Sequence, residues 1–241
     1  MSRPAGRRRR LATRLPGTYT RQMAEPRPRS GGSSSRAEVL RASPPMFRSR
    51  TLDLLTRVHP SVPPLIFCPV IVLLLFHAVG QMSAVDVLLA VLGGWILWTL
   101  TEYWIHRTVF HFEPEGRLGG RLHWMIHGVH HDHPNDPMRL VMPPVVSVPI
   151  GTACFVLFVL LGAPGWALCA GFFAGYLAYD MLHFALHHHR PRSRAGRLLH
   201  ELHMRHHFED EQRGFGVSAP WWDIAFRTRA TRVRGSSSRR R

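Results

Sequence analysis

Residues 62–106 read VPPLIFCPVIVLLLFHAVGQMSAVDVLLAVLGGWILWTLTEYWIH. It contains two apolar runs, 62–80 and 84–105, which are separated by only a short turn. Each run is close to the roughly 20 residues that an α-helix needs to cross a bilayer. Core helices of soluble proteins seldom continue so far with so little charge. The stretch therefore predicts a helical hairpin in a membrane.

A second apolar pair follows at residues 140–162 and 165–186, and the two runs are again joined by a very short connection. Neither tight connection carries a basic residue, whereas arginines are abundant in the segments that leave the other ends of the runs. Basic residues stay on the cytoplasmic side of a membrane. We therefore expect an all-α integral membrane protein with four transmembrane helices, a multi-pass topology, and both termini and the 106–139 connection in the cytoplasm.

The positive charge of the chain belongs to its ends. Residues 1–50 carry 13 arginines against two acidic residues, and residues 227–241 carry seven arginines and no acidic residue. The ends thus account for +18, more than the net +16 of the whole chain, so the part between them carries about −2. Pro, Gly and Ser surround these arginines, a composition typical of disorder. We expect disordered basic tails at 1–45 and 229–241, a membrane domain at 46–228, and no nucleic-acid partner.

Histidine is concentrated in two blocks, which hold 15 of the 17 histidines. Both blocks leave the predicted membrane on its cytoplasmic side, where a helical bundle can bring them together. The first block follows the second apolar run, and the second block ends and follows the fourth. Their members are His106, His111, His123, His127, His130, His131 and His133, then His183, His187, His188, His189, His200, His203, His206 and His207.

The spacing within the blocks predicts helix faces lined with imidazole. In HWMIHGVHH the four histidines stand at i, i+4, i+7 and i+8, an arc of roughly 100° on an α-helix. Neutral imidazole is the commonest protein ligand for transition metals. Adjacent residues such as His130 and His131 diverge by roughly 100° on a helix, so their rings more naturally serve different ions. The pattern favours a dinuclear metal centre.

Three other interpretations of the histidines fit the sequence less well. HELHMRHH resembles the zinc-protease motif HExxH, but that motif requires histidine at the position of Met204, so Glu201 loses its catalytic role. A metal transporter needs ionisable groups deep in the spans, and the apolar runs are almost bare of them. HHH at 187–189 fits a basic surface patch, but a patch does not explain four histidine segments on one side of a membrane.

Four segments carry a specific resemblance: EYWIHRTVFHFEP, LHWMIHGVHHDHPNDPMRLVMPP, YDMLHFALHHH and HELHMRHHFEDEQRGFGVSAPWWD. They resemble the histidine boxes of the fatty acid hydroxylase superfamily of sterol desaturase-like membrane enzymes, and most closely the fatty acid 2-hydroxylases. The likeness runs from about residue 46 to 228. It implies four transmembrane helices, a cytoplasmic helical cap that holds a histidine-rich dimetal site, and a non-haem di-iron oxidoreductase. Its cofactors would be two iron ions, which zinc can replace on isolation, together with O₂.

Ten metal ligands follow from matching the boxes of that family, namely His106, His111, His127, His130, His131, His183, His187, His203, His206 and His207. His123 and His188 also match family positions, where they would bind a metal or orient a ligand. The remaining three histidines of the blocks, His133, His189 and His200, depart from the pattern and are left out of the predicted site.

Acidic residues near the boxes are candidates for fixing the imidazoles, because a metal-bound histidine usually donates its other N–H to an acceptor. Asp180 lies three residues before His183, and an acid at a membrane edge is otherwise unfavourable. Glu102 and Asp136 are the next candidates, although Asp136 in PNDP also fits a simple turn. The aromatic block at 221–226 fits an interfacial anchor.

The chemistry agrees with the resemblance. An aliphatic C–H bond offers nothing for acid or base side chains to act on, so a redox metal and O₂ must attack it. We expect a lipid acyl substrate, fatty acid 2-hydroxylation, and electrons from a separate protein of cytochrome or ferredoxin type. A sterol or carotenoid hydroxylase or desaturase with similar boxes is the alternative enzyme. A membrane metal-binding or transport protein is the non-enzyme alternative.

Overall fold

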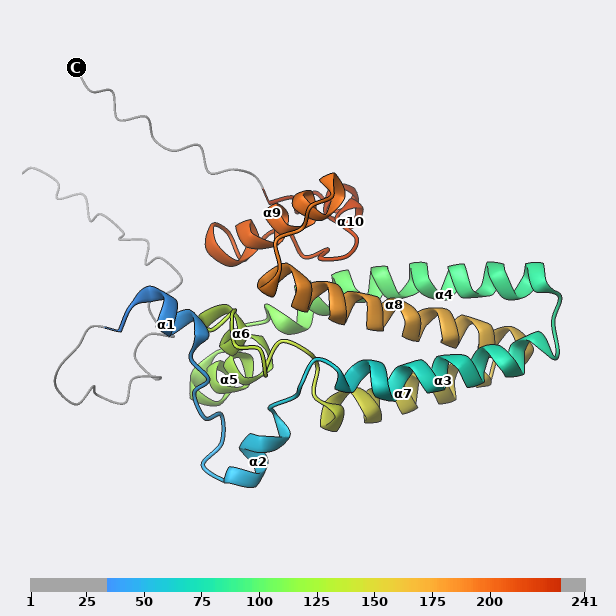
Figure 1. The fold of residues 1–241 in the computed structure, drawn as a ribbon, viewed down its shortest axis with the longest axis horizontal. Coiled ribbons are helices and arrows are strands. Elements are labelled where there is room, and N and C mark those ends of the chain that lie inside the picture. The colour runs from blue at the N-terminus through green and yellow to red at the C-terminus, as the bar shows by residue number, and fades with distance from the viewer. Residues whose placement is uncertain (1–33, 231–241) are drawn as a thin grey trace, which may run out of the picture. The chain divides into compact units, whose positions relative to one another are not determined.

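The computed structural model describes residues 34–230, and every regular element in that range is a helix. Figure 1 shows the long helices running beside one another and the short ones gathered toward one end of them. In chain order the elements are α1 (Arg36–Arg41), α2 (Arg50–Leu55), α3 (Val62–Val79), α4 (Ala84–Ile105), η2 (His106–Phe110), α5 (Gly116–His123), η3 (Trp124–Gly128), α6 (Val129–Asp132), α7 (Pro144–Val159), α8 (Ala163–His188), α9 (Arg194–Phe208) and α10 (Trp221–Ala225).

Helix α8 forms the centre of the bundle made by α3, α4, α7 and α8. It packs against all three of the other helices, most extensively against α4. Thirteen of its 26 residues are buried, among them Phe172, Phe173 and Tyr176. Trp98 of α4 and Phe67 of α3 meet this face with edge-on ring contacts. The core of the bundle is therefore aromatic and is built around α8.

The outward faces of the surrounding helices are apolar. Leu65 and Phe76 of α3 are 72% and 77% exposed, and Leu157 of α7 is 67% exposed. Exposed apolar surface on this scale is unusual for a soluble protein. Two helical stretches, Val62–Val79 and Ala84–Phe110, are long and apolar enough to cross a membrane, and α7 is apolar but shorter. These two stretches coincide with the first two spans predicted from the sequence.

Glycines let α4 and α8 approach closely. A Cβ on Gly94 would lie 2.0 Å from the carbonyl oxygen of Leu168, and one on Gly171 would lie 2.0 Å from that of Val91. Small residues permit such backbone contact between helices in membranes, where packing rather than hydrophobicity drives association. The close contact fixes the end of α4 relative to the end of α8, and both ends carry histidines.

The short helices connect the two histidine blocks. The segment from η2 to α6 joins α4 to α7, and α9 and α10 follow α8. Both groups of short helices lie toward the same end of the bundle in Figure 1. This arrangement places the two blocks together, as the hairpin pattern of the sequence predicts.

The N-terminal boundary differs from the predicted tail at 1–45. Residues 1–33 lie outside the described residues, but Ser35 begins α1 with a capping box in which Ser35 and Glu38 bond each other's backbone amides. The α1 segment contacts the residue that follows α6, since His133 Nδ1 donates to the Val39 carbonyl at 2.6 Å. The compact unit that contains these helices therefore begins at Ser35. The predicted tail at 229–241 falls outside the described residues from 231 onward.

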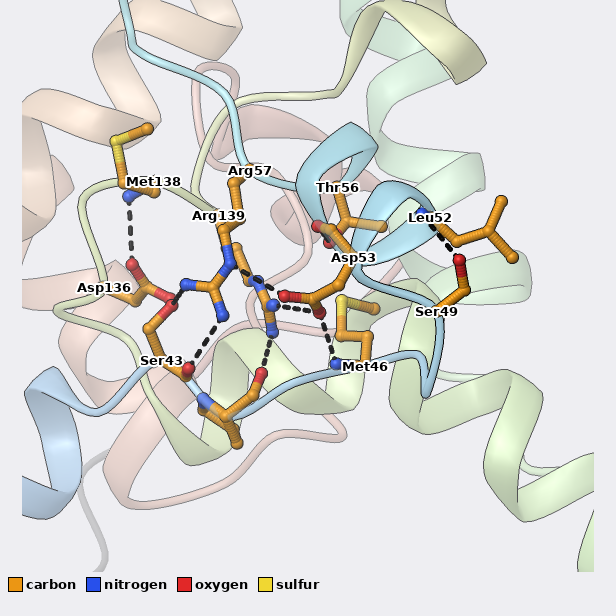
Figure 2. A network of polar contacts seen from close by, with 11 residues as sticks. Ser43, Met46, Ser49, Leu52, Asp53, Thr56, Arg57, Asp136, Met138 and Arg139 are labelled. Atoms are coloured by element: carbon orange, nitrogen blue, oxygen red, sulfur yellow. Dashed lines mark hydrogen bonds and ion pairs between the residues drawn. The ribbon is translucent and has the colours of Figure 1, made fainter.

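A buried carboxylate fastens the next part of this N-terminal segment. Asp53 of α2 accepts hydrogen bonds from the Met46 amide at 2.7 Å, from Arg57 at 3.0 Å and from Arg139 at 2.8 Å. Figure 2 shows both guanidinium groups converging on Asp53, with Ser43 beside them. The network ties residues 43–57 to the connection before α7.

Candidate metal centre

Ten histidine rings meet where the two blocks come together, and they form two groups of five. Within each group, one nitrogen from every ring lies within 4.8 Å of the corresponding nitrogens of the others. Group one contains His106, His111, His127, His131 and His206, and group two contains His130, His183, His187, His203 and His207. These ten residues are the same ten that the motif resemblance selects as ligands.

A π-helical turn brings His106 and His111 into group one. On an α-helix, residues five apart point about 140° away from each other. Here the His111 amide donates to the His106 carbonyl at 3.2 Å, the i to i+5 bond of a π-turn, which makes η2 wider than an α-helix. The two rings then face the same way, with their Nε2 atoms 3.2 Å apart. The spacing HxxxxH thus suits a π-helix.

A second π-turn, η3, changes which histidines of HWMIHGVHH share a face. The sequence predicts one arc of four on an α-helix. In the structure the turn over Trp124–Gly128 keeps His127, His130 and His131 in the centre but leaves His123 at the side. His123 Nδ1 lies 3.1 Å from the Phe112 carbonyl, and the residue belongs to neither group. The extra residue in the turn explains the difference.

Adjacent histidines divide between the groups. His130 belongs to group two and His131 to group one, and His206 and His207 are split in the same way. The groups touch where the His131 and His207 rings stack with their centroids 4.3 Å apart. Two neighbouring sites therefore share the segments η3–α6 and α9.

The distances between ring nitrogens suit a metal ion in each group. Transition metals bind imidazole nitrogen at about 2.1 Å, so two ligands at a right angle lie about 3.0 Å apart. The short Nε2–Nε2 separations are 3.0 Å for His111–His206, 3.1 Å for His127–His131, 2.9 Å for His130–His183 and 2.8 Å for His187–His203. These separations match the distance expected between two neighbouring ligand atoms on one metal ion.

The protonation of the rings leads to the same conclusion. His106 Nδ1 lies 2.7 Å from the Phe215 carbonyl, and His206 Nδ1 lies 2.8 Å from the Arg213 carbonyl. A carbonyl only accepts, so each Nδ1 carries the hydrogen, and Nε2 of the neutral ring holds a lone pair. Both lone pairs point toward the Nε2 atom of His111. Lone pairs that converge in a buried site repel one another unless a cation lies between them, so the site fits a metal.

Burial keeps these imidazoles neutral. Desolvation, followed by the neighbouring His206 and His131, lowers the pKa of His111 to about 2. Desolvation also lowers the pKa of His206 to about 4, although the carbonyl of Arg213 acts in the opposite direction. Burial and the surrounding rings lower the pKa values of His127, His130, His131, His203 and His207 well below the ordinary value. Neutral imidazole is the form that binds metals.

The carboxylates predicted to orient the histidines make other contacts in the described structure. Asp180 accepts from the Met142 amide at 3.2 Å and lies 3.4 Å from the Tyr176 hydroxyl. Glu102 accepts from the amide of Ser218 at 2.8 Å and from its hydroxyl. Asp136 accepts from the Met138 amide, as a turn residue does. Backbone carbonyls, which leave no signal in the side-chain sequence, take the predicted role at His106 and His206.

The histidines left out of the predicted set stay outside both groups. His188 is outside them as well, with its ring packed beside Phe184 at 4.5 Å. Glu201 is paired with Arg205 on α9. Of the aromatic residues at 221–226, Trp221 is exposed, whereas Trp222 donates to Thr99 of α4 at 3.1 Å.

Taken together, these features define a class of protein: a helical bundle with an apolar surface, capped by two histidine groups that can each hold a transition metal. The family profile described as fatty acid hydroxylase matches residues 91–228. The chain belongs to the fatty acid hydroxylase family.

Several characterised proteins are similar to this chain. The dihydroceramide fatty acyl 2-hydroxylase FAH1 of Arabidopsis thaliana is 34% identical over 191 residues, which cover 78% of this chain and 81% of that protein. The rat fatty acid 2-hydroxylase is 41% identical over 143 residues, 56% of this chain and 38% of that protein. A solved structure of full-length scs7p, with only its hydroxylase domain visible, has a TM-score of 0.71 and 35% identity, and the match covers 75% of this chain and 70% of that one.

Proposed function

We propose that this protein is an O₂-dependent dimetal enzyme that hydroxylates carbon 2 of a lipid acyl chain. The observation that carries the proposal is the pair of five-histidine groups. Seven of the ten rings are buried and the other three are partly buried. Burying so many polar groups is costly, so stability alone does not explain them.

The substrate class follows from the relatives. Proteins named as dihydroceramide fatty acyl 2-hydroxylase, ceramide very long chain fatty acid hydroxylase and fatty acid 2-hydroxylase share 34–41% identity with this chain in the matched region. We assign a fatty acyl chain, free or within a sphingolipid, to this protein on that basis. The apolar outer surface of the bundle supports a substrate that arrives from a bilayer.

The ten grouped histidines would hold two iron ions, five ligands for each. When bound, the metals supply the redox chemistry that an unactivated C–H bond requires. The chain itself positions the histidine rings that would bind the metals. Burial keeps the rings neutral and ready to bind, the carbonyls of Phe215 and Arg213 fix the tautomers of His106 and His206, and the close packing of α4 on α8 sets the separation of the groups.

The membrane arrangement is part of the proposal. The four apolar runs would span the bilayer within a hydroxylase domain at about 46–228, extended to Ser35 by the packing of α1, and the basic tails would lie outside it. The histidine cap and both termini would face the cytoplasm, in keeping with the positive-inside rule. A separate cytochrome-type or ferredoxin-type protein would deliver electrons to the cap.

Lipid analysis in a host that lacks hydroxylated fatty acids tests the proposal. The full chain is expressed with iron available, and total fatty acids are released and measured by mass spectrometry. We expect 2-hydroxy fatty acids from the wild type and none from a variant carrying His130→Ala and His131→Ala. His200→Ala, a change on α9 outside both groups, is the matched control and should retain product. An unchanged profile from a fully metal-loaded wild type would refute the acyl 2-hydroxylase assignment.

A further inference from the structure

The loop between α9 and α10 presents two backbone carbonyls to group one. The Phe215 carbonyl accepts from His106 Nδ1, and the Arg213 carbonyl accepts from His206 Nδ1. The two histidines come from different blocks of the sequence, and the loop accepts from both of them. Whatever holds this loop also holds the orientation of both rings.

Asp223 of α10 holds the peptide that faces His106. Its Oδ2 accepts from the Gly216 amide at 2.8 Å, and its Oδ1 accepts from the Phe215 amide at 2.9 Å. The Gly216 N–H and the Phe215 carbonyl belong to the same planar peptide unit and point in opposite directions. Anchoring the N–H on Asp223 therefore aims the carbonyl at His106. A hydrogen bond on the N–H also polarises the carbonyl and makes it a better acceptor.

Thr228 holds the peptide that faces His206 in the same way. The Gly214 amide, which shares its peptide unit with the Arg213 carbonyl, donates to the Thr228 carbonyl at 2.8 Å. Thr228 is in turn fixed by Asp223, because its hydroxyl donates to Oδ1 and its amide to the Asp223 carbonyl, both at 2.8 Å. Both peptide planes are thus linked to Asp223, a residue that is 4% exposed.

The backbone around the carboxylate is adapted to this contact. Gly214 has a φ of 80°, in the region that favours glycine, and a Cβ on Gly216 would lie 2.4 Å from the Ala219 carbonyl oxygen and 3.0 Å from Asp223 Oδ2. Arg227 has a φ of 58°, which is uncommon for a residue with a side chain. Left-handed residues persist where surrounding contacts hold them, and this one turns Thr228 back onto Asp223.

The second group has no equivalent support among residues 34–230. The Nδ1 atoms of His130, His203 and His207 are buried there without a hydrogen-bond partner; in group one the same is true of His131, whereas His106 and His206 are held by carbonyls. The contacts of Asp223 thus support two histidines of group one and none of group two. This asymmetry separates a positioning role from a general role in folding.

We propose that Asp223 is a positioning residue that fixes the metal-binding geometry of group one alone, through the peptides at 213–216. The inference rests on the proposed dimetal function, since it concerns how the chain orients two of the ligands. Groups that orient metal-bound histidines typically change metal affinity by 10–100-fold when they are removed. We expect that change at one of the two metals.

Metal release from the purified, iron-loaded full chain tests this inference. Release to a competing chelator is followed with time and with chelator concentration, and metal content is measured per chain. The wild type should release two metals in two phases. Asp223→Asn keeps the shape of the side chain but offers an amide N–H to a backbone donor. It should lower the affinity for the metal released in one phase by 10–100-fold and leave the affinity for the other metal unchanged. Thr228→Val removes the hydroxyl that bonds Asp223 and Tyr103 but keeps the backbone hydrogen bonds of residue 228, so it should lower the affinity for the same metal by less.

Asp53→Asn is the matched control. Asp53 is also a buried carboxylate that accepts from a backbone amide, but its network reaches Met46, Arg57 and Arg139 rather than a grouped histidine (Figure 2). It should leave both phases as in the wild type. Equal weakening of both phases in Asp223→Asn and Thr228→Val, or no change in either variant, would overturn the inference. A wild type that binds two metals with this asymmetry but forms no 2-hydroxy acid would refute the proposed substrate and leave the role of Asp223 intact.

Discussion

The contact between α4 and α8 can be tested at two neighbouring glycines, Gly93 and Gly94. A Cβ on Gly94 would lie 2.0 Å from the Leu168 carbonyl oxygen and 2.8 Å from the Phe172 amide nitrogen. Ordinary contact begins near 3.4 Å, so Gly94→Ala forces the two backbones apart by about 1.4 Å along that contact. A Cβ on Gly93 would meet only a methyl group of Leu168, at 3.4 Å. The pair therefore isolates backbone crowding from the change of residue type.

The energetic terms have opposite signs. Alanine is favoured over glycine inside a helix by about 1 kcal/mol, and both variants gain this. Overpacking costs about 1–3 kcal/mol, and only Gly94→Ala incurs it. We expect Gly93→Ala to be at least as stable as the wild type and Gly94→Ala to be about 1–3 kcal/mol less stable than Gly93→Ala. Because α4 leads into His106 and α8 carries His183, the separation should also lower the metal content of Gly94→Ala.

Both variants are compared as full chains in detergent. The temperature at which half of each protein leaves the monodisperse peak on size exclusion is measured, together with metal per chain. Equal stability and equal metal content of the two variants would show that the backbones are not in contact at Gly94, and the reasoning would fail.

Three further predictions concern the histidines, the loop before α10 and the start of α1. In the metal-free protein, the pKa values of His111 and His206 are about 2 and 4, below the ordinary value near 6.5, so the unfolded chain binds more protons than the folded chain below pH 6.5. The free energy of unfolding should therefore decrease as the pH is lowered, by about 4 kcal/mol for the two groups together at pH 5. A thermal midpoint that is flat from pH 7.5 to 5 would contradict this. Gly214→Val should cost about 1–2 kcal/mol, because its φ of 80° is left-handed, and should reduce bound metal; undiminished stability in thermal unfolding would exclude the strain. Ser35→Ala should remove a cap of about 1 kcal/mol and speed amide exchange across Arg36–Arg41, which unchanged protection would disprove.

The sequence predicts the helical class and the grouped histidines because both depend on side-chain pattern. Apolar runs identify α3 and α4 directly, and the run at 165–186 also identifies α8, which is less apolar because it carries Asp180 and several histidines. The ten grouped histidines follow from motif matching. The grouping of His106 with His111 does not follow from α-helical periodicity, because it requires a π-turn.

The groups that orient the rings are harder to predict from sequence, for a physical reason. A carboxylate such as Asp180 is visible in a sequence, but the carbonyl of Phe215 has no residue-specific signal. Asp223 lies far along the chain from His106, and only the fold shows that they act on the same peptide. The S-x-x-E pattern at Ser35 is a recognisable helix start, and it gives the N-terminal boundary of the folded unit more accurately than composition does.

The location of bound metal tests whether the two histidine groups are metal sites. A structure of the iron-loaded protein, with diffraction recorded at the iron absorption edge, should show two anomalous peaks. One peak should lie about 2.1 Å from ring nitrogens of group one and the other about 2.1 Å from ring nitrogens of group two. A single peak, or a metal bound away from these ten rings, would contradict the account.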